Sequence, residues 1–332
     1  MKKNNTISSH TASISNLKKL AVTYSPLTNE RLKKIKNAAI GYEVELMKSD
    51  EQRIKECEII FGTISPKLLP EATELKWLHT QFSGVDYFLN PDNNFPKDVI
   101  LTNSAGTFGI AISEYLLTVT LMLMRRNLEY ARLQFQNTWK PLGEVKSIYG
   151  SKICIVGLGD IGENFAKRCK ALGAIINGVV RTPRVVMPEV VDKLYTIDQL
   201  DEAIEKADVV ALCLPQTNET IGLFNEARIS NMKHGALLLN IGRGTAIDTN
   251  ALIRALQSGQ LGGAGLDVTD PEPLPSDSPL WQMDNVIITP HISGNETLEL
   301  TNDLIVDKFI KYLHDYLADR EFERIVDKEV GY

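Results

Sequence analysis

Three polar residues stand where predicted strands end, and together they could perform acid–base chemistry. Arg243 follows the apolar run LLLNIG, Glu272 lies in DVTDPEPLP, and His291 follows NVIITP. Open α/β sheets bind ligands at the carboxyl ends of their strands, so we expect these side chains to converge. A guanidinium can bind a carboxylate through two hydrogen bonds, an imidazole can move a proton, and a carboxylate raises the proton affinity of an imidazole. This set suffices for the reduction of a carbonyl if a nicotinamide supplies the hydride.

Each of these residues also has an ordinary structural explanation. An arginine after a strand often forms a surface ion pair, and a glutamate between prolines is often a solvated loop residue. A single histidine is usually structural. Taken one at a time, Arg243, Glu272 and His291 therefore leave both explanations open.

The element that must position a cofactor is the stretch KICIVGLGDIG, a short apolar run that ends on glycines spaced G-x-G-x-x-G. We expect Gly157 to allow a tight turn, Gly159 to let a pyrophosphate approach the backbone, and Gly162 to let helix and strand pack closely. The free amides near Asp160 and Ile161 would face the phosphates at the positive end of the helix. Glycine turns also occur in α/β proteins without a ligand, so this motif alone leaves dinucleotide binding open.

Short apolar runs alternate with helical ones along the rest of the chain. In the first half the apolar runs are LAVTYS, IIFGT, KWLHTQF and VILTNS, and NERLKKIKNA and DEQRIKEC lie between them. After the glycine motif we expect strands at 174–179, 209–214, 236–241, 263–268 and 286–288. This alternation is typical of βα units around parallel sheets. A chain of 332 residues with 43% hydrophobic content is expected to form two domains.

Two helices are expected to connect those domains. Residues 108–125 are apolar on almost every face, so this helix should be buried between layers or domains and mark a domain crossing. The last long helix, from about Glu296 to Leu317, has an apolar stripe and one polar face. It is expected to return to the first domain.

The composition argues against several kinds of partner. The net charge is -6, from 36 basic and 42 acidic residues, and no Lys/Arg cluster indicates a nucleic-acid surface. The cysteines have neither a CxxC pair nor metal-ligand spacing, so we expect no metal site and a reducing compartment. No apolar stretch reaches the roughly 20 residues that a membrane span needs. The polar N-terminal arm MKKNNTISSHTASISN lacks the apolar core of a secretory signal and is expected to be disordered.

From about residue 80 to residue 295 the chain resembles the D-isomer-specific 2-hydroxyacid dehydrogenases. The matching stretches are SGVDYF, VGLGDIG, CLPQTNET, LLLNIGRGTAID, GGAGLDVTDPEPLP and NVIITPHISG, in that family's order and spacing. The resemblance implies that Arg243 binds and polarises a 2-oxo acid, that Glu272 pairs with His291, and that His291 is the acid–base residue. The first 75 residues resemble the family only in their rhythm.

The same resemblance implies contacts with the substrate and the cofactor. The backbone at Ser83 and Gly84 would bind the substrate carboxylate. Asp267, in the LDV stretch, would contact the nicotinamide carboxamide. Ile241, in the LLLNIG stretch, is counted among the cofactor-binding residues.

The chain departs from the family pattern at one loop. Many members have a histidine in the stretch that reads CLPQT here, so only the packing of this loop against the nicotinamide, through Leu214 and Pro215, is carried over. The family's formate-oxidising branch has a glutamine where this chain has Glu272, which argues against that reaction.

The resemblance implies an α/β fold with two doubly wound parallel-sheet domains and a cleft between them. A Rossmann cofactor domain would span residues 107–296. A flavodoxin-like substrate domain would be discontinuous and would combine residues 1–106 with the C-terminal helix in residues 297–332.

The segment after the second strand of the cofactor domain bears on cofactor choice. NAD-specific sites of this kind hold the ribose 2′-hydroxyl with an Asp or Glu about twenty residues past the glycines. Here the strand ends at Val180, and no carboxylate occurs from Ala174 to Pro188. Arg181, together with Arg184, could pair with a 2′-phosphate, so NADP(H) is expected over NAD(H). Both arginines could instead be solvated loop residues.

The expected protein is a cytoplasmic NAD(P)-dependent oxidoreductase that interconverts a small 2-oxo acid and its D-2-hydroxy acid, with glyoxylate or hydroxypyruvate favoured, and that forms a homodimer. Trp139 sits where related reductases place a tryptophan that reaches a neighbouring subunit's site, or it anchors the end of a helix over residues 128–139. The alternative function is a dinucleotide-sensing interaction module, because transcriptional co-repressors share this fold and keep the triad. The absence of a long tail of partner motifs favours the enzyme.

Overall fold

The computed structural model describes residues 17–294 and 298–331. The described part divides into two compact units. Unit 1 holds residues 17–81, 88–103 and 306–326, and unit 2 holds residues 82–87, 104–294, 298–305 and 327–331. The segment 82–87 therefore groups with unit 2, although the predicted division assigned it to the N-terminal domain. The N-terminal arm that we expect to be disordered, residues 1–16, lies outside the described residues.

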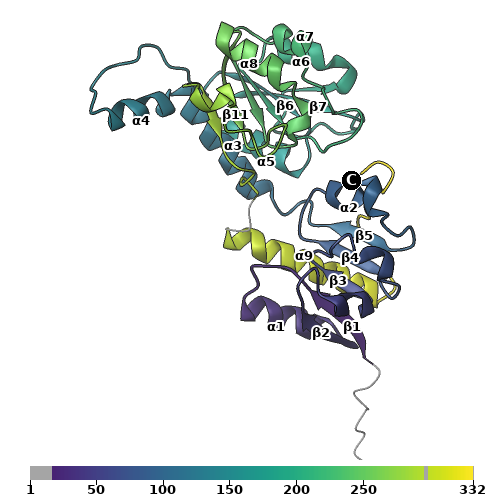
Figure 1. Cartoon of the computed structure of the whole chain (residues 1–332). Helices are drawn as coiled ribbons and strands as arrows, with labels where there is room; N and C mark the ends of the chain where they lie inside the picture. The colour runs from purple at the N-terminus through teal and green to yellow at the C-terminus, as the bar shows by residue number, and fades with distance from the viewer. Residues whose placement is uncertain (1–16, 295–297, 332) are drawn as a thin grey trace, which may run out of the picture. The chain divides into compact units, whose positions relative to one another are not determined.

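Unit 1 is built on a five-stranded parallel sheet (Figure 1). Its strands are β1 (Lys18–Val22), β2 (Tyr42–Leu46), β3 (Ile59–Phe61), β4 (Trp77–Thr80) and β5 (Ile100–Asn103), in the spatial order β2-β1-β3-β4-β5. This is the strand order of flavodoxin-like doubly wound folds. The predicted flavodoxin-like fold is therefore confirmed for unit 1.

The helices of unit 1 are short apart from the first and the last. They are α1 (Asn29–Ala38), α2 (Asp86–Leu89), whose first two residues group with unit 2, the 3-10 helices at Gln52–Glu56, Leu69–Glu71 and Pro91–Asn93, and the second half of α9 (Glu299–Leu317). Helix α1 starts where NERLKKIKNA begins, because the side chain of Thr28 accepts a hydrogen bond from the amide of Arg31 at 3.2 Å.

An aromatic stack joins the C-terminal helix α9 to the sheet of unit 1. The ring of Phe309 lies 4.1 Å from that of Phe61 and 5.4 Å from that of Trp77, measured between centroids. Trp77 also stacks on Tyr316 at 5.3 Å. Phe61, Phe309 and Trp77 are completely buried. The last helix thus returns to the N-terminal sheet, as its apolar stripe predicts.

Unit 2 contains a seven-stranded parallel sheet. Its strands are β6 (Lys152–Val156), β7 (Ile175–Val180), β8 (Lys193–Thr196), β9 (Val209–Leu212), β10 (Ala236–Asn240), β11 (Leu261–Leu266) and β12 (Val286–Ile288), in the order β12-β11-β10-β9-β6-β7-β8. The direction of winding reverses between β6 and β9, and open α/β sheets bind their ligands at such a reversal. This is the predicted Rossmann topology with one added strand, β12.

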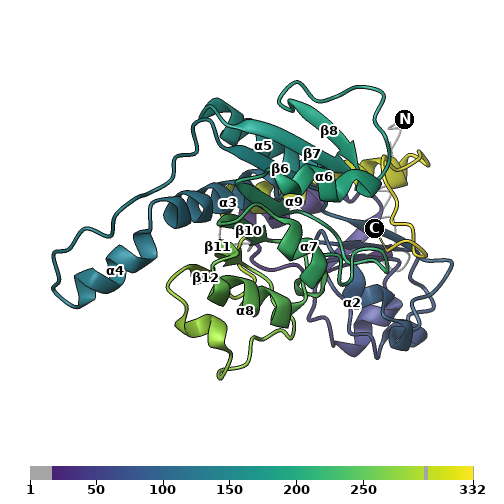
Figure 2. The same ribbon diagram turned by 90° about the horizontal axis from the view of Figure 1, so that it is seen from above.

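Helices cover both faces of this sheet (Figure 2). They are α3 (Gly109–Met124), α4 (Asn127–Phe135), α5 (Asp160–Ala171), α6 (Leu200–Glu205), α7 (Glu226–Asn231) and α8 (Thr249–Ser258), with 3-10 helices at Ile197–Gln199, Gly244–Ala246 and Pro279–Gln282. Helices α3 and α5 pack against each other on one face, and α6, α7 and α8 lie on the opposite face. The inner strands β9 and β10 are buried on both sides, which explains their continuous apolar sequences.

Helix α3 is less enclosed than its composition predicts. Leu116 and Val119 are buried against the sheet and α5, but Leu117, Leu121 and Met122 remain half-exposed. The chain enters unit 2 before α3 begins, so the helix follows the crossing and belongs entirely to unit 2. The expectation that helix α3 is buried on almost every face is therefore wrong for a single copy of the chain.

Helix α4 and the loop after it extend away from the rest of unit 2 (Figures 1 and 2). The helix predicted over residues 128–139 ends at Phe135, and Asn137 adopts a left-handed conformation with φ 50°. The side chains of Phe135 and Trp139 are 87% and 102% exposed. Trp139 therefore does not anchor the helix end, and that alternative is wrong.

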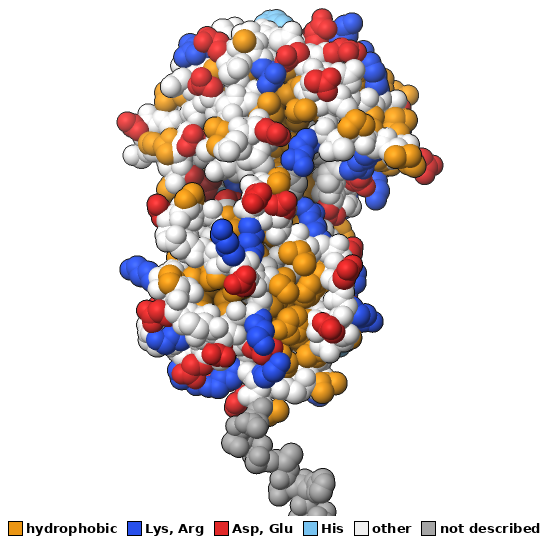
Figure 3. Space-filling view, turned by 90° about the vertical axis from the view of Figure 1, so that its right-hand side faces the viewer, with side chains coloured by type: hydrophobic (Ala, Val, Ile, Leu, Met, Phe, Trp, Pro, Cys, Tyr) orange, Lys and Arg blue, Asp and Glu red, His pale blue; other side chains and the backbone are white. Residues whose placement is uncertain are grey.

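The surface has no broad area of one charge on the face drawn in Figure 3, where basic and acidic side chains alternate. Among the described residues, no helix combines the length and the hydrophobicity that a bilayer span requires.

Candidate active site

The glycine turn after β6 has the geometry of a phosphate-binding turn. Gly157 has φ 100°, and a Cβ at this position would lie 2.5 Å from the carbonyl oxygen of Cys213. A Cβ on Gly162 would overlap the carbonyl of Gly157, whereas one on Gly159 would meet no atom within 4 Å. Two glycines are thus required by close packing, and the middle one leaves its surface open for a ligand.

Helix α5 begins directly at this turn. Asp160 is its first residue and Ile161 its second, so their backbone amides lie at the positive end of the helix. One oxygen of Asp160, Oδ1, accepts a hydrogen bond from Asn164 at 3.0 Å. The open backbone at Gly159 and the helix end beside it fit a dinucleotide pyrophosphate.

The segment after β7 borders the same turn. Arg184 pairs with Glu163 of α5 at 2.5 Å and donates to the carbonyl oxygen of Leu158, between the first two glycines. Arg181 is exposed at the end of the strand. The sequence predicts that Arg181 and Arg184 together could pair with a 2′-phosphate. In the structure Arg184 instead binds the glycine turn.

Turns after β9 and β10 pack against the glycine turn. A Cβ on Gly242 would overlap the carbonyl of Leu214, and one on Gly157 would lie 3.2 Å from the side chain of Leu214. Pro215 is exposed next to Leu214, and Ile241 is buried beside Gly242. The structure therefore brings together cofactor residues that the resemblance assigned from separate motifs.

His291 and Glu272 form a hydrogen-bonded pair, as predicted. Nδ1 of His291 lies 2.8 Å from Oε1 of Glu272, and each side chain is 44% exposed. A carboxylate can only accept, so Nδ1 carries the hydrogen in this contact and Nε2 is left for proton exchange.

The turn that carries His291 is held by Asp267. His291 has φ 53°, a left-handed conformation that a histidine rarely adopts without support. Its amide donates to the carbonyl of Asp267 at 2.8 Å, and the amides of Ile292 and Ser293 donate to the Asp267 carboxylate, each at 2.9 Å. Asp267 is only 1% exposed. Sequence reasoning missed this supporting role, because nothing in the LDV stretch points to the later turn.

A hydroxyl chain extends the same network into helix α3. Thr289 donates to Oδ1 of Asp267 at 2.6 Å, and the hydroxyl of Tyr115 lies 2.6 Å from that of Thr289. Burial raises the pKa of Tyr115 to about 12, so this phenol stays protonated at neutral pH and can donate to Thr289. The catalytic turn is thereby tied to the helix that covers the sheet.

Arg243 is fixed by the turn that follows β10. The side chain of the buried Asn240 donates to the carbonyl of Arg243 at 2.8 Å and accepts from the amide of Gly242 at 3.0 Å. A Cβ on Gly244 would overlap the backbone of Thr269, so the arginine turn lies in direct contact with the loop that leads to Glu272.

The guanidinium of Arg243 contacts the segment that the SGVDYF motif forms. Nη2 of Arg243 lies 2.7 Å from Oδ1 of Asp86, and a Cβ on Gly84 would overlap Nη2. Ser83 is exposed next to Gly84. Burial alone would raise the pKa of Asp86, but its hydrogen bond with Arg243 and the nearby positive charges of Arg243 and His291 hold that pKa below its ordinary value. Asp86 is thus the ion-pair partner of Arg243, and sequence reasoning missed it although its motif was recognised.

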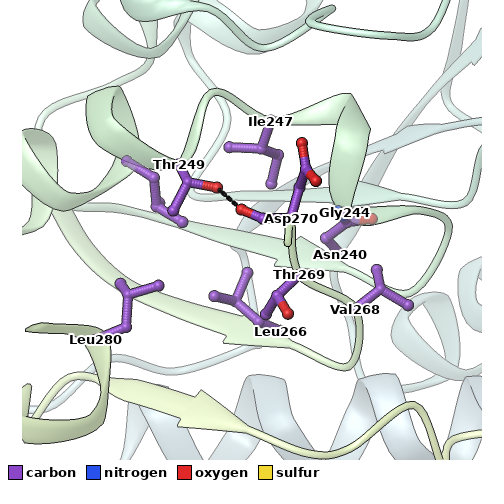
Figure 4. A pocket seen from close by; sticks show the side chains of 10 residues that line it. Asn240, Gly244, Ile247, Thr249, Leu266, Val268, Thr269, Asp270 and Leu280 are labelled. Carbon is purple, nitrogen blue, oxygen red and sulfur yellow. Dashed lines mark hydrogen bonds between the residues drawn. The ribbon is translucent and has the colours of Figure 1, made fainter. Parts of the chain in front are cut away.

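A small pocket lies behind these turns (Figure 4). It is lined by Asn240, Gly244, Ile247, Thr249, Leu252, Leu266, Val268, Thr269, Asp270 and Leu280. The hydroxyl of Thr249 donates to the carbonyl of Asp270 at 2.7 Å across it. Arg243, Glu272 and His291 do not line this pocket, so it is part of the packing behind the two turns.

Trp139 is not brought to these residues within the chain. Its side chain is fully exposed on the arm that contains α4. The other candidates of this sheet follow the carboxyl ends of β6, β7, β9, β10, β11 and β12, and Gly84 lies against Arg243. A guanidinium, an imidazole–carboxylate pair and a phosphate-binding turn in one unit can bind an anionic carbonyl compound, move a proton and hold a dinucleotide.

Comparisons with known proteins agree with this chemistry. The profile of the D-isomer-specific 2-hydroxyacid dehydrogenase NAD-binding domain matches residues 117–293. A glyoxylate reductase from Thermofilum pendens is 33% identical over 71% of this chain and 70% of its own length.

Solved structures of the same family have the same fold. A family member from Aeromonas salmonicida is 32% identical, with a TM-score of 0.81 over 94% of this chain and 99% of its own. An NADPH-dependent glyoxylate/hydroxypyruvate reductase from Sinorhizobium meliloti, solved with NADP and sulfate, is 26% identical, with a TM-score of 0.81 over 95% of this chain and 100% of its own.

The fold and these matches define a nicotinamide-dependent dehydrogenase. The chain belongs to the D-isomer-specific 2-hydroxyacid dehydrogenase family. It is therefore an NAD(P)-dependent oxidoreductase that transfers a hydride between the cofactor and a 2-hydroxy or 2-oxo acid.

The support of the His291 turn generates a first prediction. Thr289→Val removes the donor to Asp267 and the partner of Tyr115, so the imidazole should lose its fixed position. We expect kcat for a 2-oxo acid to fall roughly tenfold, and the free energy of unfolding to fall by about 1–3 kcal/mol. Steady-state kinetics and urea denaturation measure the two effects.

Thr118→Val is the matched control, because Thr118 lies exposed on α3 and its hydroxyl donates only to the carbonyl of Glu114. A Thr289→Val enzyme with kcat within twofold of wild type would show that the hydrogen bonds of Thr289 do not position His291.

Proposed function

We propose that this enzyme reduces a small 2-oxo acid, glyoxylate or hydroxypyruvate, with NADPH, and that His291 is its acid–base residue. The observation that carries the proposal is the 2.8 Å contact between His291 and Glu272, in the same unit as the 2.7 Å contact between Arg243 and Asp86. Support for the substrate class comes from the glyoxylate reductase of T. pendens and the glyoxylate/hydroxypyruvate reductase of S. meliloti.

In this proposal each side chain has one task. Arg243 binds the substrate carboxylate and polarises the 2-oxo group, with the backbone at Ser83 and Gly84 completing the carboxylate site. The backbone at Gly157 to Gly162 would hold NADPH, which would supply a hydride to C2 of the 2-oxo acid. The carbonyl oxygen gains its proton from Nε2 of His291, and Glu272 stabilises the imidazolium before that transfer. Asp267 would contact the nicotinamide carboxamide while holding the His291 turn.

The proton-transfer role can be tested directly. His291→Ala leaves the alkoxide without a proton donor, so we expect kcat to fall about 10²- to 10⁴-fold while the KM for NADPH is retained. The measurement is absorbance at 340 nm with a panel of 2-oxo acids, which also identifies the substrate. His234→Ala, an exposed histidine elsewhere in unit 2, is the control. Turnover by His291→Ala within threefold of wild type on the best substrate would exclude the role.

We also propose that NADPH is preferred over NADH. The strand β7 ends at Val180, no carboxylate follows before Glu189, and Arg181 lies exposed at the strand end. A 2′-phosphate would meet no acidic repulsion there, and Arg181 could form a charge-assisted hydrogen bond with it. Arg184 contributes indirectly, because it is engaged with Glu163 and the glycine turn.

The cofactor preference leads to two variants with opposite expectations. Arg181→Ala should raise the KM for NADPH while changing that for NADH little. Val180→Asp should reverse the preference, because a carboxylate accepts from the ribose 2′-hydroxyl and repels a phosphate. Kinetics with both cofactors measure this. A wild-type kcat/KM that is higher for NADH would refute the preference.

A homodimer is the third part of the proposal. The arm exposes Phe135 and Trp139, and α3 leaves Leu117, Leu121 and Met122 half-exposed in the same unit. Exposed apolar side chains of this size mark an interaction surface, and a second copy of the chain is the partner we propose. Trp139 would then reach the partner's substrate site. The four free cysteines support a reducing, cytoplasmic location.

The arm can be tested by separating association from selectivity. Trp139→Ala should change the ratio of kcat/KM values for glyoxylate and hydroxypyruvate. Phe135→Ala removes another exposed aromatic from the arm and should weaken association, but it should leave that ratio unchanged at protein concentrations where the variant is still dimeric. Light scattering measures the mass. A wild-type monomer with full activity would contradict both the dimer and the role of Trp139 in trans.

A further inference from the structure

Asp86 is the charged partner of Arg243, and the described function does not yet use it. Oδ1 of Asp86 lies 2.7 Å from Nη2 of Arg243, although the two residues are 157 positions apart in sequence. The side chain of Arg243 is 24% exposed, and that of Asp86 is 48% exposed. A half-exposed carboxylate therefore stands directly beside the guanidinium that would receive the substrate.

The contact between Asp86 and Arg243 leaves most of the guanidinium donors available. Only one oxygen of Asp86 and one terminal nitrogen of Arg243 take part. Nη1 donates to the carbonyl of Gly242 at 2.8 Å. An arginine has five N–H donors, so Nε and the second hydrogens of both terminal nitrogens can still bind a substrate. A carboxylate that occupied the substrate position would be expected to take two of these donors side by side.

The surroundings of Arg243 leave its guanidinium little freedom to turn. Gly84 lies so close that a Cβ there would overlap Nη2 and come within 2.9 Å of the Asp86 carboxylate. Asn240 fixes the backbone of the arginine from the other side. Asp86 is the charged group among these contacts, so it sets the direction in which the planar fork points.

We propose that Asp86 is a positioning residue that orients the guanidinium of Arg243 for the carboxylate and carbonyl of a 2-oxo acid. This inference rests on the proposed function of Arg243. A long side chain loses rotamer entropy when substrate binding fixes its geometry. A partner that already holds the side chain before binding reduces this loss. Asp86 acts through Arg243, because its carboxylate would repel an anionic substrate.

The charge of Asp86 also limits which substrates the arginine accepts. A 2-oxo acid with one carboxylate can use the free donors of the fork. A second anionic group placed near Asp86 would be repelled by a charge that is not neutralised at physiological pH. Loss of this charge should therefore weaken binding of monoanionic substrates more than that of dianionic ones such as 2-oxoglutarate.

The experiment measures anion binding and turnover in the same set of variants. Asp86→Ala and Asp86→Asn are compared with wild type for the Kd of oxamate in the NADPH complex and for KM and kcat with glyoxylate. We expect Asp86→Ala to weaken oxamate binding at least tenfold and to raise the KM for glyoxylate similarly, with the KM for NADPH unchanged. Asp86→Asn should lie between, because its amide oxygen still accepts from Nη2 without the charge.

A double-mutant cycle separates positioning from a structural role. In an Arg243→Lys background, Asp86→Ala should change oxamate binding by less than twofold, because the group it acts through is gone. Asp201→Ala is the matched control: Asp201 pairs with Arg228 at 2.7 Å on the surface of the same unit. This control should leave oxamate binding at the wild-type value.

Three results would overturn the proposal. Tighter oxamate binding by Asp86→Ala would mean that Asp86 competes with the substrate for Arg243. Equal losses in the wild-type and Arg243→Lys backgrounds would mean that Asp86 does not act through the arginine. A loss below twofold in Asp86→Ala would remove the role altogether.

The proposed function fails separately. A wild-type enzyme that binds oxamate and shows the expected Asp86 dependence, but reduces no 2-oxo acid, would disprove the reaction and leave the positioning intact. A wild-type enzyme that does not bind oxamate would overturn both.

Discussion

The candidate site depends on turns that touch through their backbones. Gly157 packs on the carbonyl of Cys213, Gly242 on that of Leu214, and Gly244 on the backbone of Thr269, each without room for a Cβ. Because interiors resist compression, these contacts fix the cofactor turn, the arginine turn and the glutamate loop relative to one another. The candidate side chains Arg243 and Glu272 take their positions from this packing.

Asp267 is a buried carboxylate that also supports the His291 turn. A buried carboxylate is costly unless it is hydrogen-bonded, and Asp267 satisfies this condition by accepting from the hydroxyl of Thr289 and the amides of Ile292 and Ser293. These bonds support the left-handed turn at His291. The cost of burying the charge is thus offset by the same contacts that place the imidazole of His291, so one residue determines both the local stability and the position of that imidazole.

The fold was predictable where the sequence is uniformly apolar. The inner strands β9 and β10 are buried on both faces, and their runs of valine, alanine and leucine indicate this directly. The strands β2 and β8 were missed, because they lie at sheet edges and mix charged with apolar residues, as in YEVEL and KLYT. Edge strands carry polar side chains that prevent pairing with other chains, so their sequences resemble loops.

The sequence also predicted the site only in part, because contacts between distant residues leave no local pattern. Arg243, Glu272 and His291 were chosen as candidates because each follows a predicted strand, and the matching family stretches then implied their roles. Neither signal reports which side chains pair across the fold, so the contact of Asp86 with Arg243 was not visible in the sequence. A parallel sheet brings distant segments to one edge, and the partner of a charged residue there depends on where several turns end. Ion pairs such as Asp86–Arg243 therefore depend on how the glycine turns pack against one another in three dimensions. A local sequence motif does not report this packing.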